Sequence, residues 1–237
     1  MINSSLSIVV PAFNEEEHLE KAVAKYNRVA KSMFKDYEII IFNDCSTDKT
    51  GKIADRIARK NSKVRVVHNK KNMGLGYNYR TGFKLAKKEY FIGLSGEGDA
   101  QEASVRRILK HAGKADLILS YINNTHDRHW MRRLLSRSFT IILNTLFGLK
   151  VKYYNGYVLH KTKILKKVRM STNSFAYQAE IEVRLLKSKK YTYMEVPYST
   201  AKTVGSSMFR IKNIIGMATT VLTLLNDIYI KKDVGVK

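Results

Sequence analysis

Two carboxylates placed two residues apart offer the clearest chemistry in this sequence. Glu97 and Asp99 flank Gly98 directly after an apolar run, and Gln101 follows with a further side-chain oxygen. Alternate residues of an extended loop can point at one place, and hard divalent cations combine carboxylate oxygens with substrate phosphates. The segment therefore predicts a Mg²⁺ or Mn²⁺ site at Glu97, Asp99 and Gln101, where the metal would neutralise a diphosphate leaving group. An acidic surface turn is the alternative for such a pair taken alone.

A second set of candidate residues lies around two other apolar runs. Pro11, Phe13 and Glu15 come after the first run, and Asp44 comes shortly after Phe42, which ends the second. A carboxylate at such a place suits a base edge or a ribose hydroxyl in an open α/β sheet, and the Phe13 ring could stack on a base. We therefore predict a nucleotide site that includes these five residues. Capping by Asp44 and a helix-dipole role for Glu15 are the structural alternatives.

A glycine-rich segment, Asn72-Met73-Gly74-Leu75-Gly76, opens a predicted helix. Backbone N–H groups at a helix start can bind an anion. Gly74 therefore joins the predicted nucleotide-sugar site, as does Gly98, where a ligand can approach the backbone closely. The alternative is steric, because helices often begin at glycine without any ligand.

The elements that must position these residues alternate along the chain. Short apolar runs predict strands at 6–10, 38–42, 64–67, 90–94, 117–119, 157–160 and 191–196. Helical periodicity predicts helices at 15–31, 53–58, 74–86, 103–111, 128–147, 179–186 and 211–230. This order predicts an α/β fold, with a mainly parallel, Rossmann-like sheet and helices on both faces. Site loops are expected at the carboxyl ends of the strands.

Charge is the unusual feature of the composition. The 237 residues carry a net charge of +23, while 44% of them are hydrophobic, enough for a core. Such a field favours nucleic acid, acidic lipid headgroups or phosphorylated substrates. The basic residues are spread over the chain without a nucleic-acid motif, so we expect no nucleic-acid partner. The single cysteine, Cys45, excludes an internal disulfide.

The order of the motifs resembles family-2 glycosyltransferases with the GT-A fold, and within them the dolichyl-phosphate mannose synthase-like branch. Pro11, Phe13 and Glu15 match the proline–aromatic–Asn–Glu segment that opens the nucleotide site of that branch. Residues 43–48 match its Asp-Asp-Gly-Ser-x-Asp segment, except at positions 43 and 45. Residues 72–76 match its Asn-x-Gly-x-Gly segment. Residues 97–101 match its Asp-x-Asp-x-Gln metal motif, with a longer acidic side chain at position 97.

The resemblance continues into the carboxy-terminal half. Arg132 and Ser136 match an Arg-x-x-x-Ser pair that holds the acceptor phosphate in that branch, and Glu180 matches a helical Glu. Residues 152–157 match its Asp-x-x-x-Gly-Phe segment, with Lys in place of the acid. Lys202 and Ser207 match the ends of its Arg-x-x-Gly-x-Ser loop. The resemblance implies an acceptor-phosphate site of Arg132, Ser136, Lys202 and Ser207.

The resemblance implies a metal-dependent, inverting transfer of one sugar from a nucleoside-diphosphate sugar to a polyprenyl phosphate of the dolichyl or undecaprenyl type. Asp99, Arg132, Lys202 and Glu180 are the implied catalytic residues. An acceptor phosphate is already an anion, so it needs cations more than a general base. Three alternatives stay open: a saccharide-hydroxyl acceptor in cell-surface polysaccharide synthesis with Glu180 as base, a basic nucleic-acid-binding module, and a degenerate member that binds donor without transfer.

Two amphipathic helices, 128–147 and 211–230, predict contact with an anionic membrane; packing or homo-oligomer formation is the alternative. The uncharged stretch 213–226 is shorter than the roughly 20 apolar residues that span a bilayer, and the first residues do not resemble a signal peptide. We expect a cytoplasmic protein, peripheral on the cytosolic face of a membrane. Its GT-A domain would cover 1–207, divided into a nucleotide-binding half (1–120) and an acceptor half (121–207), before an amphipathic helical tail at 208–237.

Overall fold

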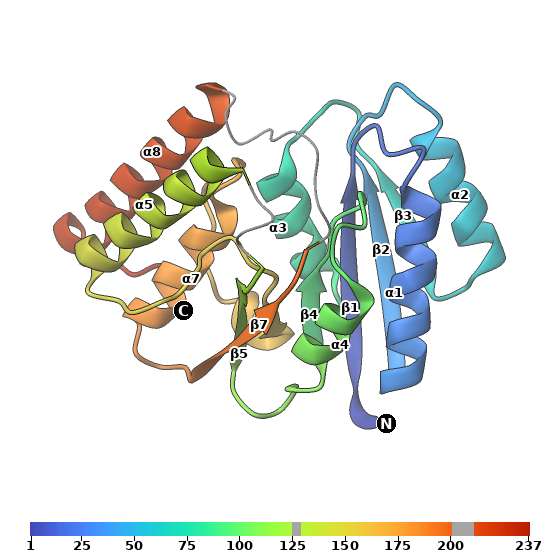
Figure 1. The fold of residues 1–237 in the computed structure, drawn as a ribbon, viewed down its shortest axis with the longest axis horizontal. Coiled ribbons are helices and arrows are strands. Elements are labelled where there is room, and N and C mark those ends of the chain that lie inside the picture. Colours follow the sequence, from blue (N-terminus) through green and yellow to red (C-terminus); the bar gives the residue numbers. More distant parts are fainter. Residues whose placement is uncertain (125–128, 201–210) are drawn as a thin grey trace.

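The computed structural model of the chain describes residues 1–124, 129–200 and 211–237 (Figure 1). Its centre is a seven-stranded sheet in the order β3-β2-β1-β4-β6-β5-β7. The strands are β1 (Ile2–Ala12), β2 (Phe34–Asn43), β3 (Val64–His68), β4 (Tyr90–Gly93), β5 (Leu117–Ile122), β6 (Leu159–Lys161) and β7 (Tyr193–Tyr198). Each of them overlaps a predicted strand, so the predicted α/β class is confirmed.

All strands of this sheet except β6 run in one direction. β1 pairs in parallel with β2 and β4, β2 with β3, and β5 with β7, whereas β6 is antiparallel to both β4 and β5. The carboxyl ends of β1, β2, β4, β5 and β7 therefore meet at one edge, where open α/β sheets bind ligands. The mainly parallel sheet is confirmed. The antiparallel direction of β6 was not predicted, because a strand of three residues has no sequence pattern that indicates its direction.

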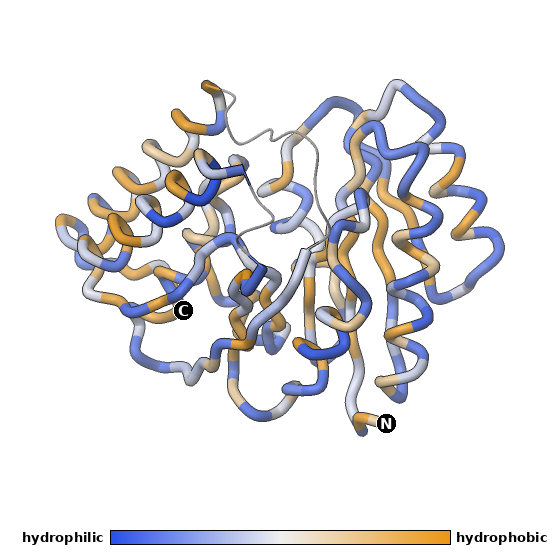
Figure 2. Tube along the Cα trace, in the orientation of Figure 1, coloured by the Kyte–Doolittle hydropathy of each residue, from blue (hydrophilic) through white to orange (hydrophobic). Residues whose placement is uncertain are grey.

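Helices cover both faces of the sheet (Figures 1 and 2). One face packs against α1 (Leu19–Met33), α2 (Thr50–Lys60) and α4 (Glu102–Leu109). The other packs against α3 (Leu75–Leu85), α6 (Thr162–Leu165) and α7 (Tyr177–Lys187). Helix α5 (Trp130–Phe147) and helix α8 (Ile211–Leu225), which continues into the π-helical turn η3 (Asn226–Ile230), lie outside α7.

Helix α1 begins at Leu19, whereas the periodicity predicted a start at Glu15. The backbone carbonyl of Glu15 accepts hydrogen bonds from the N–H groups of His18 and Leu19 in a preceding turn. Asn14 just before it has a positive φ of 55°, which asparagine tolerates better than most residues. Glu15 therefore stays in the loop after β1, beside the carboxyl edge of the sheet.

A buried ion-pair cluster attaches the carboxy-terminal segment to α7. Arg184 is fully buried, and its Nη2 lies 3.0 Å from Glu180 Oε1 and 2.8 Å from Asp227 Oδ2. Leu224 and Ile228 join the apolar core on the same face of the sheet. One side of the segment that we expected as an appended helical tail thus packs against the core, while its other side is exposed.

We expect Arg184→Leu to lower the free energy of unfolding by about 3–5 kcal/mol, because it leaves the fully buried Glu180 carboxylate without the cation with which it pairs. Urea denaturation followed by circular dichroism measures this loss. The matched control is Arg59→Leu at an exposed position of α2, expected to change stability by less than about 0.5 kcal/mol. Equal effects of the two substitutions would contradict the structural role of Arg184.

Candidate active site

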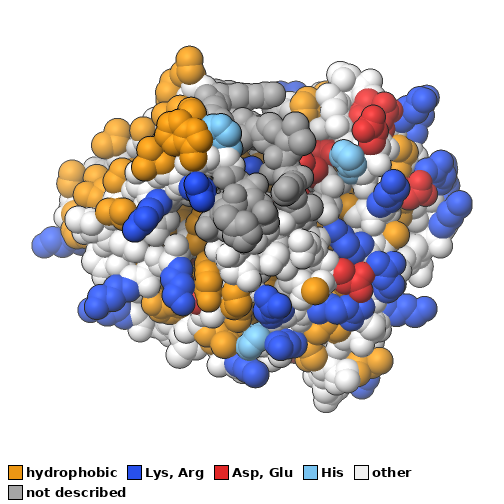
Figure 3. All heavy atoms as spheres, in the orientation of Figure 1, with side chains coloured by type: hydrophobic (Ala, Val, Ile, Leu, Met, Phe, Trp, Pro, Cys, Tyr) orange, Lys and Arg blue, Asp and Glu red, His pale blue; other side chains and the backbone are white. Residues whose placement is uncertain are grey.

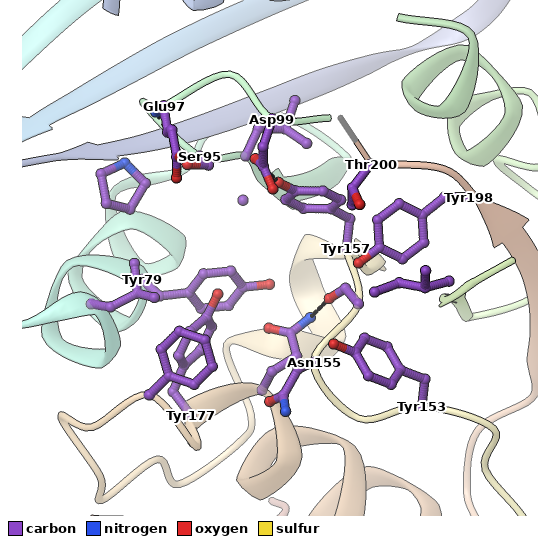
Figure 4. A pocket seen from close by; sticks show the side chains of 18 of the residues that line it. Tyr79, Ser95, Glu97, Asp99, Tyr153, Asn155, Tyr157, Tyr177, Tyr198 and Thr200 are labelled. Atoms are coloured by element: carbon purple, nitrogen blue, oxygen red, sulfur yellow. Dashed lines mark hydrogen bonds between the residues drawn. The ribbon is translucent and has the colours of Figure 1, made fainter. Parts of the chain in front are cut away.

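The loops at the carboxyl edge of the sheet enclose a cavity of about 250 Å³ (Figure 4). Pro11 near the carboxyl end of β1, Glu97 and Asp99 after β4, and Thr200 after β7 line it. Arg132 from the first turn of α5 contributes a cation to the same wall. The cavity therefore combines residues of the predicted nucleotide, metal and acceptor sites.

Helix α1 holds the acidic loop in place. Lys25 Nζ donates to the backbone carbonyls of Gly98 and Ala100, each at 2.6 Å. The Tyr26 hydroxyl donates to the carbonyl of Ser95 at 2.8 Å. Gly98 has a φ of +73°, and a Cβ built there would lie 3.0 Å from that of Ala22. Glycine is therefore favoured at this position both by backbone conformation and by close packing.

Asp99 accepts a hydrogen bond from a tyrosine that lines the same cavity. The Tyr157 hydroxyl, in the loop before β6, donates to Asp99 Oδ1 at 2.6 Å (Figure 4). Burial and the neighbouring Asp99 charge raise the pKa of Tyr157 well above its usual value. The hydroxyl is therefore a permanent donor at neutral pH.

The predicted metal ligands lie in different environments. Glu97 and Asp99 both line the cavity, whereas exposed Gln101 precedes α4 and its amide lies 3.5 Å from the Thr200 carbonyl oxygen. Within the described ranges no group of three or more acidic, histidine or cysteine side chains is placed to hold a metal ion. Two carboxylates suit Mg²⁺ or Mn²⁺ that is also bound by substrate phosphates. Glu97 and Asp99 fit that donor set, and Gln101 is not brought to it.

Several carboxylates lie close to one another where the nucleotide site was predicted. Burial, followed by the charges of Glu97, Asp48 and Asp99 and opposed by His18, raises the pKa of Glu15 to about 7. Phe13, beside it, is 45% exposed and offers its ring to a ligand. A cation or a hydrogen-bond donor bound here would relieve the repulsion among these carboxylates.

Asp44 binds the glycine-rich segment of its own chain. Its carboxylate accepts hydrogen bonds from Asn69 Nδ2, Met73 N and Gly74 N at 2.7, 2.8 and 2.9 Å. The N–H of Gly76 donates to the Asn173 carbonyl at 3.2 Å. These backbone donors of the glycine-rich segment thus have protein partners in this structure, and Asp44 braces the segment through two of them.

Two other predicted site residues lie in the interior. Phe42 is fully buried in the core between the sheet and α3, so it presents no surface to a ligand. Glu180 is fully buried as well, and its carboxylate accepts hydrogen bonds from Ser171, Thr172 and Arg184. The structure thus favours the structural role for Glu180 over that of a general base.

The predicted acceptor residues divide into three groups. Arg132 lines the cavity. Ser136 is buried, and its hydroxyl donates to the Arg132 carbonyl at 2.8 Å within α5, so it supports the turn that carries Arg132. Lys202 and Ser207 lie outside the described residues.

Aromatic residues form much of the remaining wall, and the sequence interpretation missed them. Five tyrosines line the cavity, and Figure 4 shows them arranged around it: Tyr79, Tyr153, Tyr157, Tyr177 and Tyr198. The one sequence signal was the count of 14 tyrosines. Their convergence depends on loops and helices far apart in the chain.

A family model described as Glycosyl transferase family 2 matches residues 7–169 of the chain. The chain is 26% identical over 222 residues to the polyprenol monophosphomannose synthase of Mycolicibacterium smegmatis. The matched region covers 87% of this chain and 82% of that protein. The chain is also 24% identical over 242 residues to the dolichyl-phosphate beta-glucosyltransferase of Dictyostelium discoideum, covering 94% and 74%. Similarity to the uncharacterized glycosyltransferase EpsJ of Bacillus subtilis, 30% over 112 residues, covers 47% of this chain and only 31% of EpsJ.

Solved structures resemble the whole fold. Glucosyl-3-phosphoglycerate synthase from Mycobacterium tuberculosis in complex with Mg²⁺ and UDP superimposes with a TM-score of 0.67 at 14% identity, covering 94% of this chain and 79% of that one. The same enzyme with Mn²⁺, UDP-glucose and phosphoglyceric acid gives a TM-score of 0.67 at 15% identity, with the same coverage. The predicted GT-A fold is thereby confirmed.

We expect Glu15→Gln to raise thermal stability at pH 8 and not at pH 5. The unfolded chain releases the Glu15 proton near pH 4.5, whereas the folded protein retains it up to about pH 7. Stability therefore falls as the pH rises through this window. The gain at pH 8 should be about 1–2 kcal/mol after allowance for solvent screening. Differential scanning calorimetry at both pH values tests this, with exposed Glu17→Gln as matched control; an equal effect of Glu15→Gln at both would refute it.

Proposed function

The chain belongs to glycosyl transferase family 2, and on that basis we propose that it transfers a sugar from a nucleoside-diphosphate sugar to a polyprenyl phosphate at a membrane surface. The observation that carries the proposal is the cavity in which Glu97 and Asp99 lie with Arg132. One end suits a metal-bound diphosphate, and the other presents a cation suited to an acceptor phosphate. The names of the relatives that act on polyprenol and dolichyl phosphates support this acceptor.

The donor end divides its tasks among few residues. Glu97 and Asp99 would hold Mg²⁺ or Mn²⁺, which when bound would neutralise charge on the departing diphosphate. The exposed ring of Phe13 would stack on the base, and Glu15 would accept a hydrogen bond from the base or sugar. Lys25 holds the acidic loop in place through hydrogen bonds to the carbonyls of Gly98 and Ala100.

The acceptor end needs charge more than base catalysis. A phosphate oxygen would attack the anomeric carbon from the face opposite the departing diphosphate, so one displacement inverts the configuration. Because that oxygen carries no proton to remove, Arg132 would serve by attracting and orienting the anion. A saccharide acceptor with Glu180 as base finds no support, since Glu180 is fully buried and paired with Arg184.

The outer helices support a membrane-bound acceptor. Trp130 and Leu134 on α5 are 60% and 57% exposed, and Ile215 and Leu222 on α8 are 56% and 64% exposed. Figure 3 shows apolar side chains gathered over these helices at one end of the molecule. Neither α5 nor α8 contains an Asp or a Glu, whereas α5 carries three arginines. An apolar surface whose only formal charges are cationic suits an anionic bilayer, and it disfavours pairing with a second copy, because like charges would meet.

Helix α8 with η3 is also the one described segment, Asn213–Ile230, that is long and apolar enough to cross a membrane by length and composition. The sequence estimate ended this stretch before Asp227. That carboxylate is buried against Arg184, so the charge faces the protein and the helix runs on past it. Because Thr220, Leu224, Asp227 and Ile228 are buried on one side, we propose that the helix lies along the bilayer surface.

Purified protein should transfer a sugar to undecaprenyl phosphate in detergent when supplied with a UDP- or GDP-sugar and MnCl₂ or MgCl₂. Mass spectrometry detects the glycosyl lipid and identifies the donor. EDTA should abolish the product, and Asp99→Ala should lower kcat/KM by roughly 100-fold or more. Glu180→Gln should keep transfer in the fraction that remains folded.

The matched control is Glu89→Ala, which removes an exposed carboxylate immediately before β4, at the opposite edge of the sheet. It should transfer at the wild-type rate. Donor binding without any lipid product would contradict the acceptor assignment. Loss of all transfer in folded Glu180→Gln would return the saccharide alternative.

The double substitution Leu134→Glu with Leu222→Glu should reduce binding to vesicles of phosphatidylcholine and phosphatidylglycerol by roughly tenfold or more. Each leucine contributes about 1.5–3 kcal/mol when it leaves water, and the new carboxylates are repelled by the anionic lipid. Vesicle flotation measures the bound fraction.

Leu85→Glu, at a 38% exposed leucine at the end of α3, is the control for adding a carboxylate to an apolar surface position. Unchanged flotation of the double variant would refute the membrane assignment. A native dimer that the double variant dissociates would instead assign the surface to a second copy of the chain.

A further inference from the structure

The hydroxyl of Tyr157 donates a hydrogen bond to Asp99 in the lining of the cavity, and from this contact we propose that Tyr157 is a positioning residue that orients the Asp99 carboxylate toward the metal ion. The inference rests on the proposed function, because it concerns the metal expected between Glu97 and Asp99. The distance of 2.6 Å from the phenolic oxygen to Asp99 Oδ1 is that of a charge-assisted hydrogen bond.

The place of the Tyr157 ring is set by the segment that carries it. A Cβ built on Gly156 would lie 1.9 Å from the Ser120 carbonyl oxygen, so the backbone here lies directly against β5. The carbonyl of Gly156 accepts a hydrogen bond from Gln178 Nε2 on α7 at 3.2 Å. The Tyr157 ring meets Tyr198 edge-on, with 5.5 Å between centroids. The hydroxyl is therefore presented from a fixed backbone, as a positioning group must be.

The main chain on both sides of Asp99 is fixed by another element. Lys25 Nζ bonds the carbonyls of Gly98 and Ala100, the two neighbours of Asp99. With the backbone held, rotation of the side chain is the freedom that remains. The Tyr157 hydroxyl removes it by engaging Oδ1, which leaves Oδ2 as the oxygen for a cation. Outer hydrogen bonds of this kind orient metal ligands and typically change metal affinity by about 10–100-fold.

The hydrogen bond from Tyr157 to Asp99 matters more here than it would in a site with two aspartates. The partner carboxylate, Glu97, is exposed and has the longer side chain, with one more rotatable bond to order. Precise geometry at the metal therefore depends chiefly on Asp99.

Tyr157→Phe tests the inference with a residue whose ring fits the same space. Mn²⁺ binding is measured from the electron paramagnetic resonance signal of free Mn²⁺, with UDP and with GDP in separate titrations. The Mn²⁺ dissociation constant should rise by about tenfold or more. The Mn²⁺ concentration for half-maximal transfer should rise in parallel, while kcat at saturating Mn²⁺ stays near the wild-type value.

Tyr154→Phe is the matched control, because Tyr154 is fully buried and its hydroxyl donates to Asn144 Oδ1 at 2.8 Å without contact with Asp99. It should lower thermal stability and leave Mn²⁺ affinity unchanged. Wild-type affinity in Tyr157→Phe overturns the inference, as does an equal loss of affinity in both variants. Wild-type protein that binds no Mn²⁺ with either nucleotide overturns the inference together with the metal part of the proposed function, which the EDTA arm of the transfer assay tests independently.

Discussion

The parallel pairing of β1 with both β2 and β4 is the constraint on which the rest of the structure depends. Ile8 pairs with Ile39 on one side and with Ile92 on the other. This register brings the loop with Phe13 and Glu15, the turn with Asp44, and the acidic loop to the same edge of the sheet. Residues 8–10, 39–42 and 91–92 of these strands are apolar and fully buried, so the hydrophobic effect fixes the positions from which polar side chains reach the cavity.

On this sheet, several carboxylates lie at the same edge and repel one another. Opposite charges and hydrogen bonds to the backbone stabilise that edge. The raised pKa of Glu15 records the crowding of carboxylates there. Lys25 offsets part of it from the α1 side, and Arg132 brings a cation to the acceptor side. Asp44 is an exception among the acids, because its charge is spent on internal N–H donors that brace the glycine-rich segment. Glu97 and Asp99 thus line the cavity, whereas the carboxylate of Asp44 stabilises the backbone next to it.

The sequence predicted the strands, the GT-A class and the chain positions of Glu97, Asp99 and Arg132, because motif order and periodicity are local properties. It could not predict which side chains are buried by distant segments. Glu180 was assigned to chemistry, yet its environment depends on Arg184 and, through it, on Asp227 near the end of the chain. The bond between Tyr157 and Asp99 joins residues 58 positions apart and leaves no local signature. Gln101 and Phe42 stand at the sequence positions where site residues were predicted. Gln101, however, is the residue that caps α4 and lies away from the cavity, and Phe42 points from β2 into the core.

The bond between Arg184 and Asp227 also orders events in time during synthesis. The two residues lie 43 positions apart, so at about 5–20 residues per second the ribosome needs roughly 2–9 seconds to make the second after the first. During that interval Arg184 can pair with Glu180 on its own helix, while its second partner, Asp227, has not yet been made. The sheet around β1 has all its strands by then, since β1 to β4 end at Gly93. Strands β1 to β4 can therefore pair before the segment that carries Asp227 is made.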